Sequence, residues 1–73
     1  MALRQIFADN LRRARLAAGM SQEELADVAG IDRTYVSALE RCRYAASIDV
    51  MERLATALQV TPASLLEDVG DVV

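Results

Sequence analysis

The chain has 73 residues, 53% of them hydrophobic and 26% charged, with a net charge of −3 at neutral pH. This length suits one small domain spanning residues 1–73 and excludes a separate catalytic domain, so any function must lie on the surface of a single core. The charge excludes a uniformly basic nucleic-acid binder, and the scarcity of Gly, Pro and aromatic residues favours a compact all-α fold.

The two halves of the chain differ in charge. Residues 1–43 hold seven arginines and six acidic residues, a net charge of +1, whereas residues 44–73 hold one arginine and five acidic residues, a net charge of −4. Because charge steers association, we expect the two halves to face different partners.

The cysteine and charge content bear on the compartment. Cys42 is the single cysteine, which suits a reducing environment. Asp9 and four arginines interrupt the first twenty residues, so no secretory signal is expected, and no window reaches membrane-spanning length. We therefore expect a soluble cytoplasmic protein.

The N-terminal segment predicts a helix over about residues 3–18, ended at Gly19, because its apolar residues recur at steps of three and four. The inward residues of this helix are expected to be Leu3, Ile6, Phe7, Leu11 and Ala14.

A second helix is expected to begin at Gln22 and end at Gly30. Ser21 followed by Glu24 is a capping-box pattern, in which each side chain bonds the other residue's backbone amide. The inner side of this helix is expected to contain Leu25, Ala26, Val28 and Ala29.

A third helix is expected over residues 33–41, capped by Asp32. Only residues 30–32 separate it from the second helix, and so short a link forces a steep angle between the two.

The remaining elements lie in the acidic half. Residues 43–46 lack periodicity and predict a loop, and Ser47 is expected to cap a fourth helix. Thr61 followed by Pro62 predicts a short fifth helix over residues 62–68, with Leu65 and Leu66 inward. The buried stripe of the fourth helix is expected to contain Ile48, Met51, Leu54, Ala55 and Leu58.

The third helix offers an outward face with a particular composition. Advancing about 100° per residue places Val36 and Leu39 inward, and Tyr35 and Glu40 at the borders. A helix that enters the DNA major groove needs short side chains in the middle and groups that reach bases or phosphates at the ends. The outward face meets that need with Arg33, Thr34, Ser37, Ala38 and Arg41.

Two runs of sequence carry a resemblance to a known family. GMSQEELADVAGIDRTYVSALER, followed by SIDVMERLATALQVTPASLL, resembles the helix-turn-helix domain of the Cro/C1-type (XRE) transcriptional regulators, which include phage repressors and restriction-modification controller proteins. The resemblance covers about residues 4–67. It implies a five-helix, lambda-repressor-like fold with a helix-turn-helix core at about residues 21–41, and a dimer that binds double-stranded DNA on a two-fold operator.

The resemblance also implies residue roles. Arg33, Thr34 and Ser37 take base-facing positions, and Gln22, Arg41 and Arg43 take phosphate-contacting positions. Ala38, on the same outward face, is also expected among the DNA-binding residues. Tyr35 stays open between a core position and a phosphate contact through its hydroxyl. The family pattern also implies a structural ion pair between Arg15 and Glu40.

The loop after the third helix departs from the family pattern. Cys42 stands where relatives commonly have Gly or Asn, which suit the left-handed conformation that ends a helix. This cysteine is either an ordinary thiol or, beside Arg41 and Arg43, a redox-sensitive one. Tyr44 stands in a loop that is usually polar, where one DNA contact is either missing or supplied by its hydroxyl.

A homodimer is expected because one helix reads too few base pairs to select a genomic site. The helices of about residues 47–68 carry apolar residues in excess of one small core, which suggests a two-fold interface there. The interface residues are expected to be Leu58, Val60, Leu65, Leu66 and Val69.

The sequence also bears on two other function classes. An enzyme is disfavoured, since the chain has no His, no metal-ligand cluster and no Gly-rich phosphate loop, and no cofactor or small-molecule ligand is expected. A protein-interaction module, such as an antitoxin-like or adaptor domain with lost DNA binding, is the alternative that the low net charge leaves open.

Overall fold

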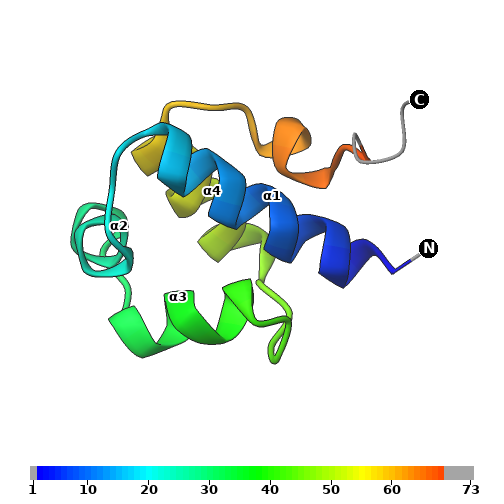
Figure 1. The fold of residues 1–73 in the computed structure, drawn as a ribbon, viewed down its shortest axis with the longest axis horizontal. Coiled ribbons are helices and arrows are strands. Elements are labelled where there is room, and N and C mark those ends of the chain that lie inside the picture. The colour runs from blue at the N-terminus through cyan, green and yellow to red at the C-terminus, as the bar shows by residue number, and fades with distance from the viewer. Residues whose placement is uncertain (1, 69–73) are drawn as a thin grey trace.

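The computed structural model describes residues 2–68, in which every regular element is helical (Figure 1). Helix α1 crosses the middle of the molecule, with α3 packed along one side and the 3-10 helix η1 along the other. Helix α2 contacts both α3 and α4. The elements are α1 (Leu3–Ala17), α2 (Gln22–Ala29), α3 (Arg33–Glu40), α4 (Ile48–Leu58) and η1 (Pro62–Leu66).

The expected fifth α-helix is a 3-10 helix instead, and it is shorter than expected. The amide of Ser64 donates to the carbonyl of Thr61 at 3.1 Å, a bond of the 3-10 type, and the Ser64 hydroxyl donates to the same carbonyl at 2.6 Å. Glu67 has already returned to extended backbone. A run of five residues cannot propagate an α-helix, because nucleation costs more than its few bonds return.

The helix starts form as the sequence predicts. The amide of Glu24 donates to Ser21 Oγ at 3.0 Å, and the amide of Ser21 donates to Glu24 Oε1 at 2.8 Å, which completes the capping box. Ser47 caps α4 by accepting from the amide of Val50. These caps satisfy amides that have no partner within the helix.

The four α-helices share one way of ending. A residue with positive φ follows each helix, and the next amide donates to the carbonyl five residues earlier, which is the Schellman arrangement. Glycine occupies this position after α1 and α2. Cys42 and Gln59, each at φ 60°, occupy it after α3 and α4. A residue with a side chain is strained in this left-handed conformation. Although Cys42 replaces the Gly or Asn of the family pattern, the backbone keeps the left-handed conformation, at a cost of roughly 1 kcal/mol.

Cys42→Gly is therefore expected to stabilise the protein by about 0.5–1 kcal/mol, because glycine adopts φ near 60° without a clash. Urea unfolding followed by circular dichroism measures this change. Cys42→Ala is the matched control, since it removes the thiol and keeps the strained Cβ. Equal stabilisation by both variants would show that the thiol, not the backbone, is responsible.

The core lies between α1 and the four later elements. It is built around the fully buried Leu11, Leu25, Val36, Leu39 and Leu54. Three residues predicted to face inward are exposed instead: Leu3, Val28 and Ile48, the last being 83% exposed. Leu3 and Ile48 are the first residues of α1 and α4, and Val28 lies beside the narrow stripe through which α2 packs.

Two residues expected at a dimer interface belong to the core. Leu58 is 6% exposed and Leu65 is 1% exposed, so neither leaves apolar surface for a partner, and that expectation is wrong. A domain this small needs its C-terminal elements to close its own core. Val60 and Leu66 are partly buried against the same core, and Val69 lies outside the described residues.

Asn10 is a buried polar residue that the sequence did not single out. Its Nδ2 donates to the carbonyls of Leu65 and Glu67 at 3.0 and 2.8 Å, and its Oδ1 accepts from Arg13 Nη1 at 2.6 Å. The Asn10 side chain thereby fastens the end of η1 to the middle of α1, which places the last described turn of the chain over the core.

Candidate nucleic-acid interface

The outward side of α3 carries the side chains that the sequence placed there, with one exception. Arg33, Thr34 and Arg41 are exposed and Ser37 is half-buried. Ala38 is only 6% exposed, so its predicted position on the outward face is wrong. The buried arc of α3 is wider at its C-terminal end, where the Ala38 carbonyl also accepts from the amide of Arg43 at 2.8 Å. We call the narrower exposed surface the α3 strip: Arg33, Thr34, Ser37 and Arg41.

Two exposed residues extend the α3 strip into the following loop. Arg43 and Tyr44 are both exposed. The Tyr44 ring meets the Tyr35 ring edge to face, with centroids 6.4 Å apart and planes at 63°. Tyr35 itself is half-buried and packs against the core. No pattern in the sequence indicates this aromatic pair, which joins α3 to the loop.

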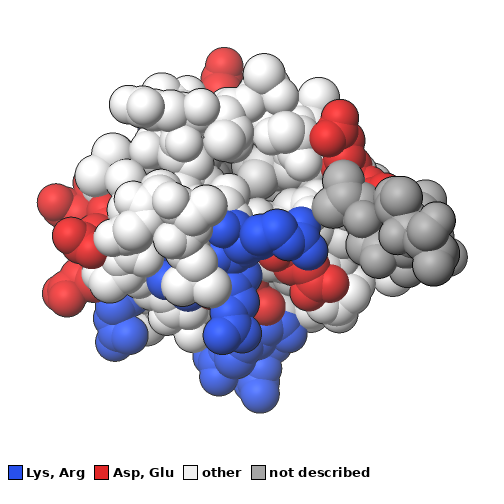
Figure 2. All heavy atoms as spheres, turned by 45° about the horizontal axis from the view of Figure 1, so that its top comes forward, with Lys and Arg blue, Asp and Glu red and all other residues white. Residues whose placement is uncertain are grey.

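Charge is unevenly spread over the surface. In Figure 2 arginine side chains gather across the centre and lower edge of the view, with some acidic side chains beside them, while a larger acidic group lies at the left edge. Helix α2 lies on that left side in Figure 1 and carries the exposed Glu23, Glu24 and Asp27. The net negative charge of the chain is therefore compatible with a local cationic surface.

The N-terminus of α3 is fixed by Asp32. Its Oδ1 accepts from the Thr34 hydroxyl at 2.5 Å and from the Thr34 amide at 2.7 Å. The hydroxyl bond first, and then the amide bond, lower the pKa of the Asp32 carboxyl, because both favour its charged form. The cap also sets the Thr34 side chain, which lies in the α3 strip.

The lowered pKa of Asp32 predicts an acid-sensitive cap. A group whose pKa is lowered by folding contributes stability above its ordinary value of 3.8, and loses it as the pH falls through the lowered value. Asp32→Asn caps without ionising, so the variant should lose less stability between about pH 5 and pH 2 than the parent chain. Urea midpoints measured across this pH range test the prediction. An equal fall of the midpoint with pH in the two proteins would contradict it.

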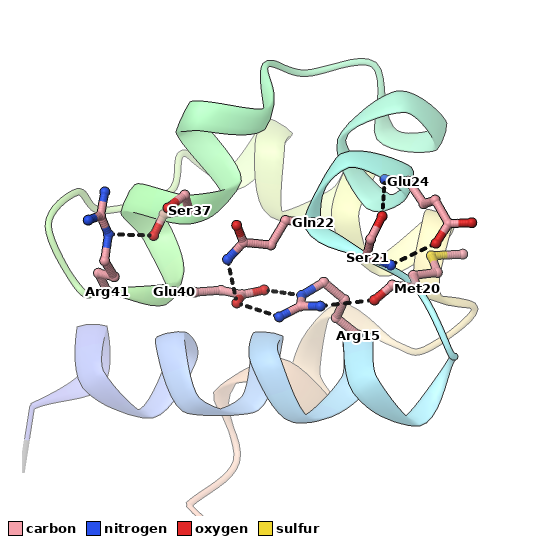
Figure 3. A network of polar contacts seen from close by, with 8 residues as sticks. All are labelled: Arg15, Met20, Ser21, Gln22, Glu24, Ser37, Glu40 and Arg41. Carbon is pink, nitrogen blue, oxygen red and sulfur yellow. Dashed lines mark hydrogen bonds and ion pairs between the residues drawn. The ribbon is translucent and has the colours of Figure 1, made fainter.

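A buried ion pair connects α3 to α1 (Figure 3). Arg15 Nε donates to Glu40 Oε2 at 2.6 Å, and Arg15 Nη2 donates to Glu40 Oε1 at 3.0 Å. Arg15 Nη1 donates to the Met20 carbonyl, and Gln22 Nε2 donates to Glu40 Oε1 at 3.1 Å. The bond to Glu40 and the attraction of its charge raise the pKa of Arg15 against the opposing effect of burial. The structure thus contains the expected Arg15–Glu40 pair and adds Gln22 to it.

The remaining polar surface shows no metal centre. Within residues 2–68 no three His, Cys, Asp or Glu side chains gather as metal ligands, and no helix is long and apolar enough to cross a membrane.

A family model described as helix-turn-helix matches residues 11–65. The chain belongs to the helix-turn-helix family. The matched residues include α2 and α3, which residues 30–32 join, and the match confirms the family expected from the sequence.

Individual helix-turn-helix relatives agree with this assignment. A hypothetical transcription factor of Neisseria meningitidis serogroup B is 48% identical over 64 residues, which cover 88% of this chain and 60% of that protein. The chain therefore spans less than two thirds of this relative's length. A solved structure of the hypothetical transcription factor NHTF from Neisseria superposes with a TM-score of 0.90 at 46% identity, covering 93% of this chain and 78% of the other.

A restriction-modification controller protein is also similar. The crystal structure of C.AhdI from Aeromonas hydrophila matches with a TM-score of 0.82 and 42% identity, over 85% of this chain and 94% of the controller. The sequence identities to the two solved structures both exceed 40%, so the likeness extends beyond the helical fold to the sequence of the helix-turn-helix domain.

Proposed function

We propose that the chain is a transcriptional regulator that binds double-stranded DNA sequence-specifically, with α3 as its recognition helix. The observation that carries the proposal is the α3 strip: short and cationic side chains are exposed on the second helix of a helix-turn-helix unit. A helix of this kind fits the major groove because its small central side chains admit the backbone close to the base edges.

Residue roles follow from position on the strip. Arg33, at the start of α3, is assigned to a guanine, whose O6 and N7 accept two parallel bonds from a guanidinium. Thr34 and Ser37 are assigned to the bases beside it. Arg41 and Arg43 at the other end are assigned to phosphates, which supply affinity and not sequence choice. Three residues outside the strip are also assigned to phosphates: Gln22 at the start of α2, and the paired Tyr35 and Tyr44. Ala38 receives no DNA contact.

We further infer that the chain acts as a homodimer on a two-fold operator. Doubling the half-site multiplies the specificity of one short recognition helix. The apolar surface that supports a partner is smaller than the sequence suggested. It includes Val60 and Leu66, and Leu66 lines an apolar hollow of about 150 Å³ with Leu3 and Met51.

We further propose that the chain regulates transcription in the cytoplasm without catalysing a reaction. The relatives described above are named as transcription factors and as a controller protein. We assign the chain no enzymatic activity, cofactor or metal. A small repressor or autoregulator fits a domain whose exposed functional surface is one helix and the loop that follows it.

Selection of bound sequences from a pool of random DNA duplexes tests the proposal. The purified protein should enrich two related half-sites with centres about 10 base pairs apart. The logarithm of the binding constant for the enriched duplex should fall linearly with the logarithm of the salt concentration. The slope should be about −0.9 for each phosphate neutralised. Absence of enrichment and of salt-sensitive binding would overturn the proposal and favour a protein-interaction module.

A further inference from the structure

We propose that Glu40 is a positioning residue for DNA binding, which acts by holding the side-chain amide of Gln22 in the orientation that donates to a DNA phosphate. The inference rests on the proposed function. It concerns a contact between α3 and α2 that is separate from the α3 strip itself.

The geometry brings three elements to one carboxylate. Glu40, the last residue of α3, accepts from Arg15 of α1 at both oxygens, at 2.6 and 3.0 Å. Oε1 also accepts from Gln22 Nε2 of α2 at 3.1 Å. The Glu40 side chain is 4% exposed, so this bond forms away from competing water. In Figure 3 the Gln22 nitrogen turns toward Glu40 and its oxygen turns away.

The carboxylate decides which end of the Gln22 amide turns inward. An ionised carboxylate only accepts hydrogen bonds, so an inward oxygen of Gln22 would meet another oxygen without a hydrogen between them. Nε2 carries two hydrogens, of which Glu40 takes one. The second hydrogen of Nε2 can donate to another acceptor, and an anionic phosphate oxygen requires such a donor.

Gln22 occupies a position where such orientation matters. It is the first residue of α2, beside backbone amides whose dipoles already favour an anion. A glutamine side chain loses rotamer freedom when it binds a ligand, and a side chain already held in place loses less. The half-buried Gln22 is held by the same carboxylate that anchors α3 to α1.

Arg15 makes this use of an acid compatible with a DNA-binding surface. A carboxylate near the phosphate backbone would repel it, but two bonds from the Arg15 guanidinium compensate the charge of Glu40. Glu40 therefore supplies an acceptor for Gln22 while adding little net charge to the interface.

A double-mutant cycle on the selected duplex tests the inference, with affinities measured by fluorescence anisotropy at a temperature where circular dichroism shows each variant folded. Glu40→Gln removes the acceptor-only group, and Gln22→Ala removes the amide. Each single variant should weaken binding about 3- to 10-fold, the size of one lost hydrogen bond, and the double variant should bind as Gln22→Ala does. Glu24→Gln is the matched control, because it removes an acid from α2, keeps the capping box and lacks a bond to Gln22.

The outcomes separate this inference from the proposed function. If the unmodified protein binds no DNA, the proposed function itself is contradicted. Two results overturn the positioning role alone, provided that the unmodified protein binds DNA. In the first, the loss of affinity in the double variant equals the product of the two single losses. In the second, Glu40→Gln binds DNA more tightly than the unmodified protein. Should Glu40→Gln fail to fold, NMR relaxation of the Gln22 side-chain amide in the unmodified protein decides. An ordered amide before DNA is added supports the inference, and a freely rotating one overturns it.

Discussion

Arg33→Ala is expected to remove the preference for one base pair in each half-site, a loss of about 1–3 kcal/mol of discrimination, while the fold remains intact. Arg33 is exposed at the first position of α3 and contributes nothing to the core. Its loss should therefore show in binding and not in stability. Affinity for the selected duplex and for duplexes mutated at single base pairs, measured at one fixed salt concentration, gives the discrimination directly.

Arg41→Ala is the matched control for Arg33, since both remove one exposed arginine from the same helix face. We expect Arg41→Ala to weaken binding to all duplexes by a similar factor and to lower the salt slope by about one unit. If Arg41→Ala relaxed sequence preference and Arg33→Ala did not, the assignment of base and phosphate contacts along the strip would be reversed.

Arg15→Leu is expected to destabilise the fold by about 3–5 kcal/mol, because it leaves the carboxylate of Glu40 buried with only Gln22 as a partner. The same change also frees the Met20 carbonyl, which Arg15 Nη1 holds at 2.9 Å. Urea unfolding at neutral pH measures the free energy. Arg12→Leu, which replaces an exposed arginine of the same helix, should change stability by no more than about 0.5 kcal/mol.

Replacing both partners distinguishes a structural ion pair from two side chains that contribute to stability independently. Arg15→Leu combined with Glu40→Leu removes both buried charges, and such replacements are often neutral or stabilising. The double variant should therefore recover much of the stability lost by Arg15→Leu. A double variant as unstable as the sum of the single ones would show that the two side chains act independently.

The local features of this fold were predictable from the sequence. Ser21 with Glu24, Asp32, Ser47 and Thr61 all cap the elements they were expected to cap, because a cap needs only residues within one helical turn. The glycine ends of α1 and α2 were predictable for the same reason. The Arg15–Glu40 pair came from the family pattern, since nothing local connects residues 25 positions apart.

Burial was predicted less well, because packing depends on where neighbouring elements lie. Periodicity places Val28 and Ile48 on an inner face, yet no element within residues 2–68 covers them, whereas Ala38 is covered on a face that periodicity marks as outward. The prediction that Leu58 and Leu65 supply surplus apolar surface is wrong, because closing the core over α1 requires both.

Two contacts of the structure had no signal in the sequence. Asn10 bonds carbonyls more than 50 positions away, and Gln22 bonds Glu40 across the helix-turn-helix unit. Asparagine and glutamine are common surface residues, so neither side chain indicates its distant partner before the chain is folded. Both bonds depend on how the helices pack side by side.

The central claim, that the α3 strip lies inside duplex DNA, is tested most directly by NMR titration of the isotope-labelled protein with its selected duplex. We expect the largest shift changes at residues 33–44 and at Gln22, with little change along the outer side of α4. Changes concentrated at residues 49–59, or none at any duplex concentration, would contradict it.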